Sequence, residues 1–268
     1  MQALTLLDVA YPSTCSTLKR LDHVLMRKPR ASICMIGDSF VWQFFCALES
    51  RLHILGHISD RTVTSHFRHG RYGLHPSSTE LRTEYGLKVR YTFTGSPRDF
   101  GANFTEYMGP LCQMSRSFTH ENISAACNIP LNQSIDYIIL GLGCAHCLLK
   151  ANQLSQAKLD SALYVRALER LSAVARAYKQ NSGGNDTRMF ILGTYSTSPQ
   201  LHHFAEVEAS FMANHSGDPL SLLDVRKVTN KPPDATRSDD LHFCIPGVPN
   251  AIVDAWASWH LLQDIRKP

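Results

Sequence analysis

Short apolar runs alternate with amphipathic stretches along most of this chain, and this alternation limits the possible folds more than any other feature. Four runs are short and apolar enough for strands buried on both faces: 32–36, 136–143, 189–194 and 220–225. Three stretches have apolar residues at helical spacing: 40–55, 155–180 and the segment that Pro249 opens. Buried strands separated by such helices predict a mostly parallel sheet that is covered on both faces, an α/β fold.

The segments between these elements are less regular. Residues 88–94 alternate apolar and polar positions, which predicts a half-exposed or edge strand. Segments 56–87 and 95–134 are long and rich in Gly, Pro, Ser and His, so they are interpreted as irregular functional insertions. No change in composition requires a second domain. We therefore expect an N-terminal extension, 1–30, and one domain, 31–268.

Charge and hydropathy exclude two classes of partner. The net charge of the 268 residues is +4, with no dense basic block, so nucleic acid is not an expected partner. No run of 18 apolar residues is present, and the N-terminus lacks the basic start of a signal peptide. Contact with a membrane is therefore expected only through an anchor outside this chain.

Two features indicate the secretory pathway. The chain has eight cysteines, an even number, and disulfides are stable in oxidising compartments. It also has five N-x-S/T sequons, more than chance predicts, although coincidence remains the alternative. Their asparagines are Asn103, Asn122, Asn132, Asn185 and Asn214. The expected location is the lumen of the secretory pathway or the cell exterior.

The most informative local motif is Gly-Asp-Ser at 37–39, between a predicted strand and a predicted helix. In an open α/β sheet, ligands bind beyond the carboxyl ends of the strands, where Ser39 would lie. Its backbone N–H belongs to a helix N-terminus, which favours the negative charge of an oxyanion. The motif therefore predicts a nucleophilic serine. The alternative from the motif alone is that Ser39 only caps the helix.

A serine nucleophile needs a base, and the candidates lie near the C-terminus. Asp239 and His242 are three positions apart, which lets the carboxylate orient the imidazole and stabilise its charged form. Both follow the last predicted strand and precede the last helix, so they too belong to the carboxyl-end rim.

Together these segments resemble a known family. Gly-Asp-Ser after a strand and a terminal D-x-x-H are similar to the GDSL/SGNH hydrolase superfamily. "DLHFCIPGVPNAIVDAW", at 240–256, resembles the C-terminal segment of its PC-esterase/trichome-birefringence-like branch. "YTFTGSP" at 91–97 and "TYSTSPQLHHF" at 194–204 resemble internal segments of that branch in the same order. The matches span most of the chain, from about 34 to 260.

The resemblance implies a flavodoxin-like three-layer αβα sandwich with Ser39 as nucleophile, His242 as base and Asp239 as its orienting residue. It also implies O-acyl transfer, with O-acetyl groups favoured, between a small acyl donor and a glycan or polysaccharide. A carbohydrate acetylesterase is the alternative within the same chemistry, and an inactive glycan-binding module is the alternative of another class. No cofactor is expected.

Departures from the family concern the oxyanion hole and the C-terminal segment. An asparagine that the family carries after one strand corresponds here to Gly141-Leu142-Gly143, a loss of roughly 3–4 kcal/mol in transition-state stabilisation if nothing replaces it. Candidate oxyanion donors are the backbone N–H groups of Ser39, Gly95, Gly141 and Gly143. In the C-terminal segment, Asp240 replaces a cysteine and Phe243 a tryptophan.

Polar side chains near the predicted rim provide the candidates for substrate binding. These are Asp38 and His202. His202 and His203 follow Ser198-Pro199, and a solvated loop is the alternative interpretation of that histidine pair.

The cysteines allow several interpretations. Cys144 and Cys147 with His146 suggest a zinc site, but no second ligand pair has the spacing that zinc sites show, so no metal is predicted. A thiol pair or disulfide-forming cysteines are the alternative there. Cys112 and Cys127 are a plausible disulfide pair. Two others, Cys34 and Cys46, are expected to be small buried apolar residues.

Overall fold

The computed structural model describes residues 21–23, 26, 30–68, 74–93, 123, 126–127, 135–141, 154–181, 187–194, 199–226 and 248–265. Seven strands form its sheet: β1 (Ser32–Gly37), β2 (Ile58–Arg68), β3 (Leu74–Thr83), β4 (Lys88–Phe93), β5 (Tyr137–Leu140), β6 (Arg188–Leu192) and β7 (Leu220–Leu223). The principal helices are α2 (Ser39–Ile54), α6 (Leu154–Asn181), α7 (Pro199–Asn214) and α9 (Val248–Ile265).

The order of the strands identifies the architecture. The sheet runs β2-β3-β4-β1-β5-β6-β7, and the five strands from β4 to β7 in this order are parallel. Numbered along the chain, these parallel strands have the order 2-1-3-4-5, which is the flavodoxin-like arrangement. The predicted α/β fold with a mostly parallel central sheet is therefore confirmed.

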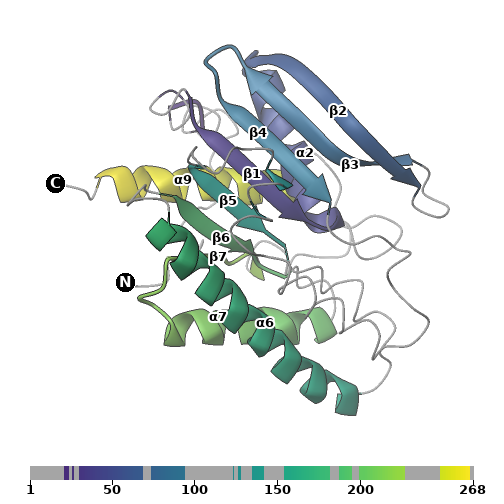
Figure 1. Ribbon diagram of the computed structural model, residues 1–268, viewed down its shortest axis with the longest axis vertical. Helices are drawn as coiled ribbons and strands as arrows, with labels where there is room; N and C mark the ends of the chain where they lie inside the picture. Colours follow the sequence, from purple (N-terminus) through teal and green to yellow (C-terminus); the bar gives the residue numbers. More distant parts are fainter. Residues whose placement is uncertain are drawn as a thin grey trace.

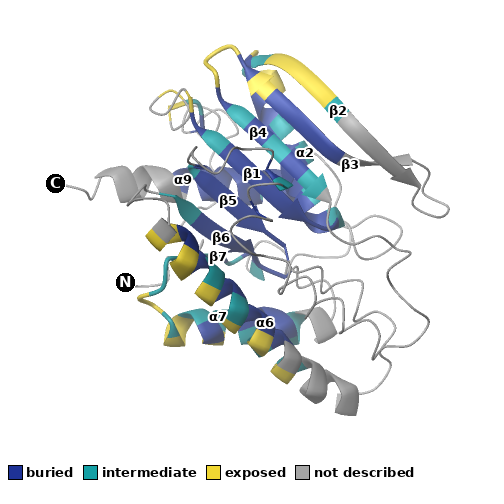
Figure 2. Cartoon of the chain, in the orientation of Figure 1, coloured by how far each residue is buried: buried dark blue, intermediate teal, exposed yellow. Residues whose placement is uncertain are grey.

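The helices cover the sheet in two pairs, which Figure 1 shows on opposite sides of it. On one face, α2 packs against β4 through the rings of Phe45 and Tyr91, and α9 packs against β5 through Trp256 and Tyr137. On the other, α6 contacts α7 through the rings of Tyr164 and Phe204. The central strands are almost entirely buried (Figure 2), so the fold is a three-layer sandwich.

The predicted helices and buried strands lie within a few residues of their observed bounds, but the prediction for 56–87 and one alternative for 88–94 are wrong. Segment 56–87 contains the antiparallel hairpin β2–β3, instead of an irregular insertion. Of the two alternatives for 88–94, the edge strand is wrong, because β3 pairs with β4 on one side and β1 on the other. The half-exposed strand agrees with the alternating burial of residues 89–92. Its alternation reflects its two faces, since Val89 and Tyr91 face the core and Arg90 pairs with Glu80.

The predicted N-terminal extension contributes to the core where the structure describes it. Leu21 is completely buried in the main hydrophobic cluster. The neighbouring Asp22 places Oδ1 2.6 Å from His57 Nε2. Residues 21–22 thus pack with the domain. The predicted boundary at residue 31, between the extension and the domain, stays a prediction.

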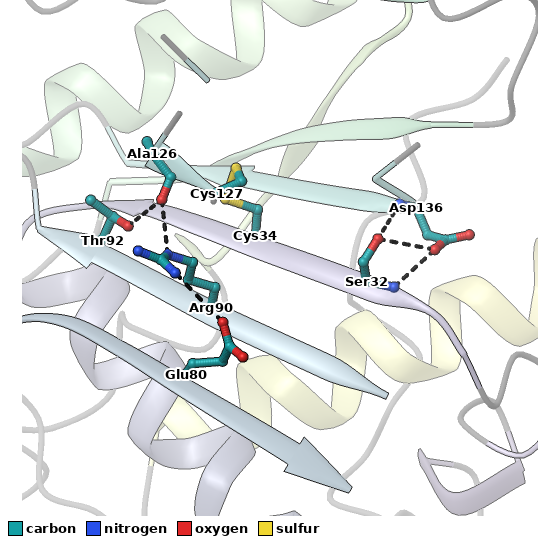
Figure 3. The surroundings of a disulfide bond; sticks show 8 residues. All are labelled: Ser32, Cys34, Glu80, Arg90, Thr92, Ala126, Cys127 and Asp136. Carbon is teal, nitrogen blue, oxygen red and sulfur yellow. Dashed lines mark hydrogen bonds and ion pairs between the residues drawn. A yellow bond between two sulfur atoms is a disulfide. The ribbon is translucent and has the colours of Figure 1, made fainter. Parts of the chain in front are cut away.

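A disulfide joins the middle of β1 to residue 127 (Figure 3). Cys34 bonds to Cys127 across 93 positions, with their Cα atoms 5.6 Å apart. The carbonyl of Ala126 accepts hydrogen bonds from Arg90 Nε (3.1 Å) and Thr92 Oγ1 (2.7 Å), which hold this segment against the sheet.

The cysteine predictions are corrected accordingly. Cys127 pairs with Cys34 and not with Cys112, which lies outside the described residues. Cys34 is buried as expected, but as half of a disulfide. Only the tertiary approach of residues 126–127 to β1 determines this pairing. Cys46 packs against the core cluster as predicted, but it is half-buried and not fully buried.

Candidate active site at the carboxyl ends of the strands

The sheet has a switch point between β1 and β5. The chain leaves β1 into α2, on one face, whereas the first described helix after β5 is α6, on the other face (Figure 1). In such sheets the ligand crevice opens outside the carboxyl ends of the two strands at this point. Gly37 ends β1 and Gly141 follows β5, so Asp38 and Ser39 lie at the position where this architecture binds ligands.

Ser39 is the first residue of α2, and the residue that caps the helix is Asp38. Asp38 has extended backbone angles and its Oδ1 accepts from the Phe40 N–H at 3.0 Å. Its carbonyl accepts the first bond of the helix, from Trp42 N at 3.0 Å. The alternative in which Ser39 caps the helix is therefore wrong. Ser39 is half-buried at the helix N-terminus, where an adjacent negative charge is stabilised.

Two glycines let α2 approach the strand ends closely. A Cβ atom on Gly37 would lie 2.4 Å from Val41 Cγ2, and one on Gly141 would lie 2.3 Å from the same methyl group. Either distance is far below van der Waals contact. The absence of both side chains therefore places the first turn of α2 directly over β1 and β5, and with it Ser39.

The carboxylate of Asp38 is buried beside these glycines. The residue is 5% exposed, and its Oδ2 has no hydrogen-bond partner within the described part of the chain. A buried carboxylate oxygen is stabilised by a donor. Contact between Asp38 and a substrate remains a prediction.

Tyr91 lies beneath the same turn and has no assigned role in the sequence predictions. This β4 residue is completely buried. Its hydroxyl is 3.4 Å from the carbonyl oxygen of Gly37 and 3.3 Å from that of Asp38. Burial raises the pKa of the phenol well above its ordinary value, and the charge of Asp38 raises it further. Strand alternation indicates a buried Tyr91, but no local signal indicates which carbonyls it contacts.

The described oxyanion candidates are not equivalent. The N–H of Gly141 donates to the carbonyl of Ile36 at 2.9 Å and so continues the β1–β5 ladder, which weighs against it as an oxyanion donor. Ser39 N–H belongs to the first turn of α2, where helix geometry supplies no intrahelical acceptor. Gly95 and Gly143 lie outside the described residues, as do Asp239 and His242. The meeting of Ser39 with its predicted base remains a prediction.

The two adjacent histidines lie on a helix and not in a solvated loop. His202, in the first turns of α7, places Nε2 3.3 Å from Glu206 Oε1, and both side chains are about half exposed. His203 Nε2 lies 2.7 Å from Ser161 Oγ on α6. Contact between His202 and a substrate remains a prediction.

A buried acid lies just beyond β6. Glu208 of α7 accepts hydrogen bonds from the backbone N–H of Thr194 (2.8 Å), from its hydroxyl (2.6 Å) and from the hydroxyl of Tyr164. Complete burial raises the pKa of Glu208 to about 7, although these hydrogen bonds lower it. This cluster ties the end of β6 to α6 and α7. The sequence predictions did not include it, since nothing local marks Glu208 as buried.

The described ranges contain no group of three or more His, Cys, Asp or Glu side chains that could hold a metal ion. The motif of Cys144, His146 and Cys147 is outside those ranges. Likewise, among the residues that the structure describes, no helix is long and apolar enough to cross a membrane.

Comparison with known proteins gives limited similarity. No family model and no curated protein matches the chain. Among solved structures, it is similar to a lipase from a goat rumen metagenome, at 13% identity and a TM-score of 0.47, over 85% of this chain and 96% of the lipase. It is also similar to a family 3 carbohydrate esterase of Clostridium thermocellum, at 12% identity and a TM-score of 0.47, over 88% and 98% of the two chains. Because both TM-scores are below 0.5, the fold assignment rests on the strand order.

Proposed function

We propose that this protein is a serine-dependent acyl-transfer enzyme in which Ser39 is the nucleophile. The observation that supports this most directly is the place of Ser39, which begins α2 at the switch point of the sheet while Asp38 caps the helix. A serine held there presents its hydroxyl beside its own backbone N–H, so the nucleophile and an oxyanion donor share one residue.

In the proposed reaction, Ser39 Oγ attacks the carbonyl carbon of an acyl ester and transfers its proton to His242. The carbonyl oxygen becomes an oxyanion beside the N–H of Ser39. The oxyanion then collapses, the ester C–O bond breaks, and the leaving alcohol takes the proton from His242. A second hydroxyl, from an acceptor or from water, reverses these steps and releases Ser39. Asp239 orients His242 throughout.

The proposed substrate is an O-acetylated sugar, with a glycan or polysaccharide as acceptor. The resemblance of segments 91–97, 194–204 and 240–256 to the PC-esterase branch supports this class. A sugar presents several hydroxyl donors, and the carboxylate of Asp38, at the N-terminus of α2, is the first proposed acceptor. His202, exposed on α7, is the second proposed contact. Hydrolysis of the same esters is the alternative outcome.

The proposed location is the lumen of the secretory pathway. The Cys34–Cys127 disulfide supports an oxidising compartment. Asn214, the one sequon asparagine within the described residues, is exposed at the end of α7, so a glycan there is compatible with the fold.

The test is acylation of the purified chain by an aryl acetate, followed by intact mass and peptide mapping. Wild-type protein should gain one acetyl group on Ser39, and Ser39→Ala should gain none. Ser50→Ala removes another half-buried hydroxyl from the same helix and should behave as wild type. His242→Ala should slow acylation by several orders of magnitude.

The fate of the acetyl group separates the alternatives. Transfer to an added oligosaccharide indicates a transferase, whereas release of acetate without an acceptor indicates an esterase. Binding of an oligosaccharide with no acylation of Ser39 at any pH would refute the enzyme and favour the inactive glycan-binding module.

A further inference from the structure

We infer that Tyr91 is a positioning residue for the oxyanion donor, acting through the peptide group that joins Asp38 to Ser39. This inference rests on the proposed function. It concerns how the fold aims and strengthens the N–H of Ser39, and it depends on a strand, β4, that contributes no predicted catalytic group.

The contacts around that peptide are specific. The Asp38 carbonyl accepts from Trp42 N at 3.0 Å and from the Tyr91 hydroxyl at 3.3 Å. The carbonyl of Gly37, one peptide earlier, lies 3.4 Å from the same hydroxyl. Carbonyl oxygens only accept, so the phenol must donate, and its single proton is shared between the two oxygens. Tyr91 thus contacts both of the peptide groups that lead into Ser39.

Peptide geometry transmits this contact to the rim. The C=O of Asp38 and the N–H of Ser39 belong to one planar trans unit and point in opposite directions. Because the carbonyl points toward a completely buried phenol, the N–H points away from it. A hydrogen bond to a carbonyl also polarises its peptide, which strengthens the N–H at the other end as a donor, by about 10–30% per bond. Tyr91 would therefore aim the oxyanion donor and increase its polarity.

Packing against α2 holds the phenol ring of Tyr91 in place. Its ring lies against two rings of α2, with centroids 4.9 Å from that of Trp42 and 5.7 Å from that of Phe45. The raised pKa of Tyr91 means that the hydroxyl keeps its proton at any pH at which the enzyme would act. The donor is therefore fixed in place and permanently protonated, as preorganised stabilisation requires.

The test compares two substitutions that separate the hydroxyl from the ring. Tyr91→Phe retains the packing against α2 and removes only the donor, whereas Tyr91→Leu removes both. We expect Tyr91→Phe to acylate Ser39 roughly tenfold more slowly, with an unchanged KM and an unchanged pH profile, since it alters neither the base nor substrate binding. Tyr137→Phe is the matched control, because Tyr137 is also buried but lies at the start of β5.

A transition-state analogue distinguishes positioning from a general loss of stability. A trifluoromethyl ketone forms an oxyanion adduct with the serine, so its inhibition constant should rise by the same factor by which kcat/KM falls in Tyr91→Phe. If wild-type protein acylates and Tyr91→Phe matches it in rate and in inhibitor binding, the inference is wrong while the proposed function stands. If wild-type protein does not acylate at Ser39, the proposed function itself fails.

Discussion

The buried acid Glu208 makes stability depend on pH in a direction that the structure determines. Its two oxygens accept three hydrogen bonds from Thr194 and Tyr164. These donors favour the ionised form, whereas complete burial disfavours it. Burial has the larger effect, and the pKa rises from 4.5 to about 7. The substitution Glu208→Gln removes the titrating group at nearly constant shape.

The sign and the magnitude follow from that pKa. Between about pH 4.5 and about pH 7, the folded protein holds a proton that the unfolded chain has released, so stability falls as pH rises through this window. A rise of about 2.5 units corresponds to roughly 3 kcal/mol at 1.36 kcal/mol per unit. Most of this loss, roughly 2–3 kcal/mol, occurs between pH 5 and pH 8, and the contribution is constant well above the folded pKa.

The assay is urea unfolding of wild type and Glu208→Gln at several pH values across this range. The difference between the two free energies of unfolding cancels the groups that they share. Wild type should lose roughly 2–3 kcal/mol relative to the variant from about pH 5 to about pH 8. Glu206→Gln, on the same helix but 58% exposed at its side chain, is the control and should show almost no such trend. A difference that is flat, or that grows in favour of wild type as pH rises, would refute this reasoning.

Three further predictions concern packing, charge and modification. Gly141→Ala should cost about 1–3 kcal/mol of unfolding free energy, but less in a Val41→Ala background, because the clash is with a Val41 methyl group; an equal cost in both backgrounds would contradict this. Asp254→Ala should cost about 3–5 kcal/mol, since it leaves the buried guanidinium of Arg51 without its partner at 2.7 Å. The double substitution Arg51→Met and Asp254→Leu should lower the free energy of unfolding by less than Asp254→Ala alone. Secreted from a eukaryotic host, the chain should carry an N-glycan at Asn214, seen by peptide mass after enzymatic deglycosylation; an unmodified Asn214 beside occupied sequons would overturn it.

The sequence correctly predicts two kinds of element: helices with one apolar face, and strands that are buried on both faces. Helix α6 and the strands β1, β5 and β6 have such patterns, and each was predicted within a few residues. The hairpin β2–β3 was missed because β2 is the edge of the sheet. Its residues 59–62 are exposed and polar, so no apolar periodicity distinguishes this strand from a loop.

The candidate site also has features that a local sequence pattern predicts and features that depend on tertiary contacts. A run of apolar residues, two turn residues and an amphipathic stretch place Ser39 between a strand and a helix, and the structure has it there. That Asp38 is the cap, and that Tyr91 supports the turn, depends on contacts that no local pattern contains. The disulfide is a further case, because eight cysteines permit many pairings and only the approach of residue 127 to β1 selects Cys34.

The sequence by itself determined the alternation of buried strands and amphipathic helices, and with it the position of Ser39 at the end of a strand. Both follow from the spacing of apolar residues, with a period of 2 in strands and about 3.6 in helices, which involves only residues near one another in the chain. The tertiary structure decided which strands lie side by side, so that Gly37 meets Gly141 and Tyr91 meets Asp38. These contacts join residues 53 or more positions apart, and they exist only because one packed sheet brings their strands together.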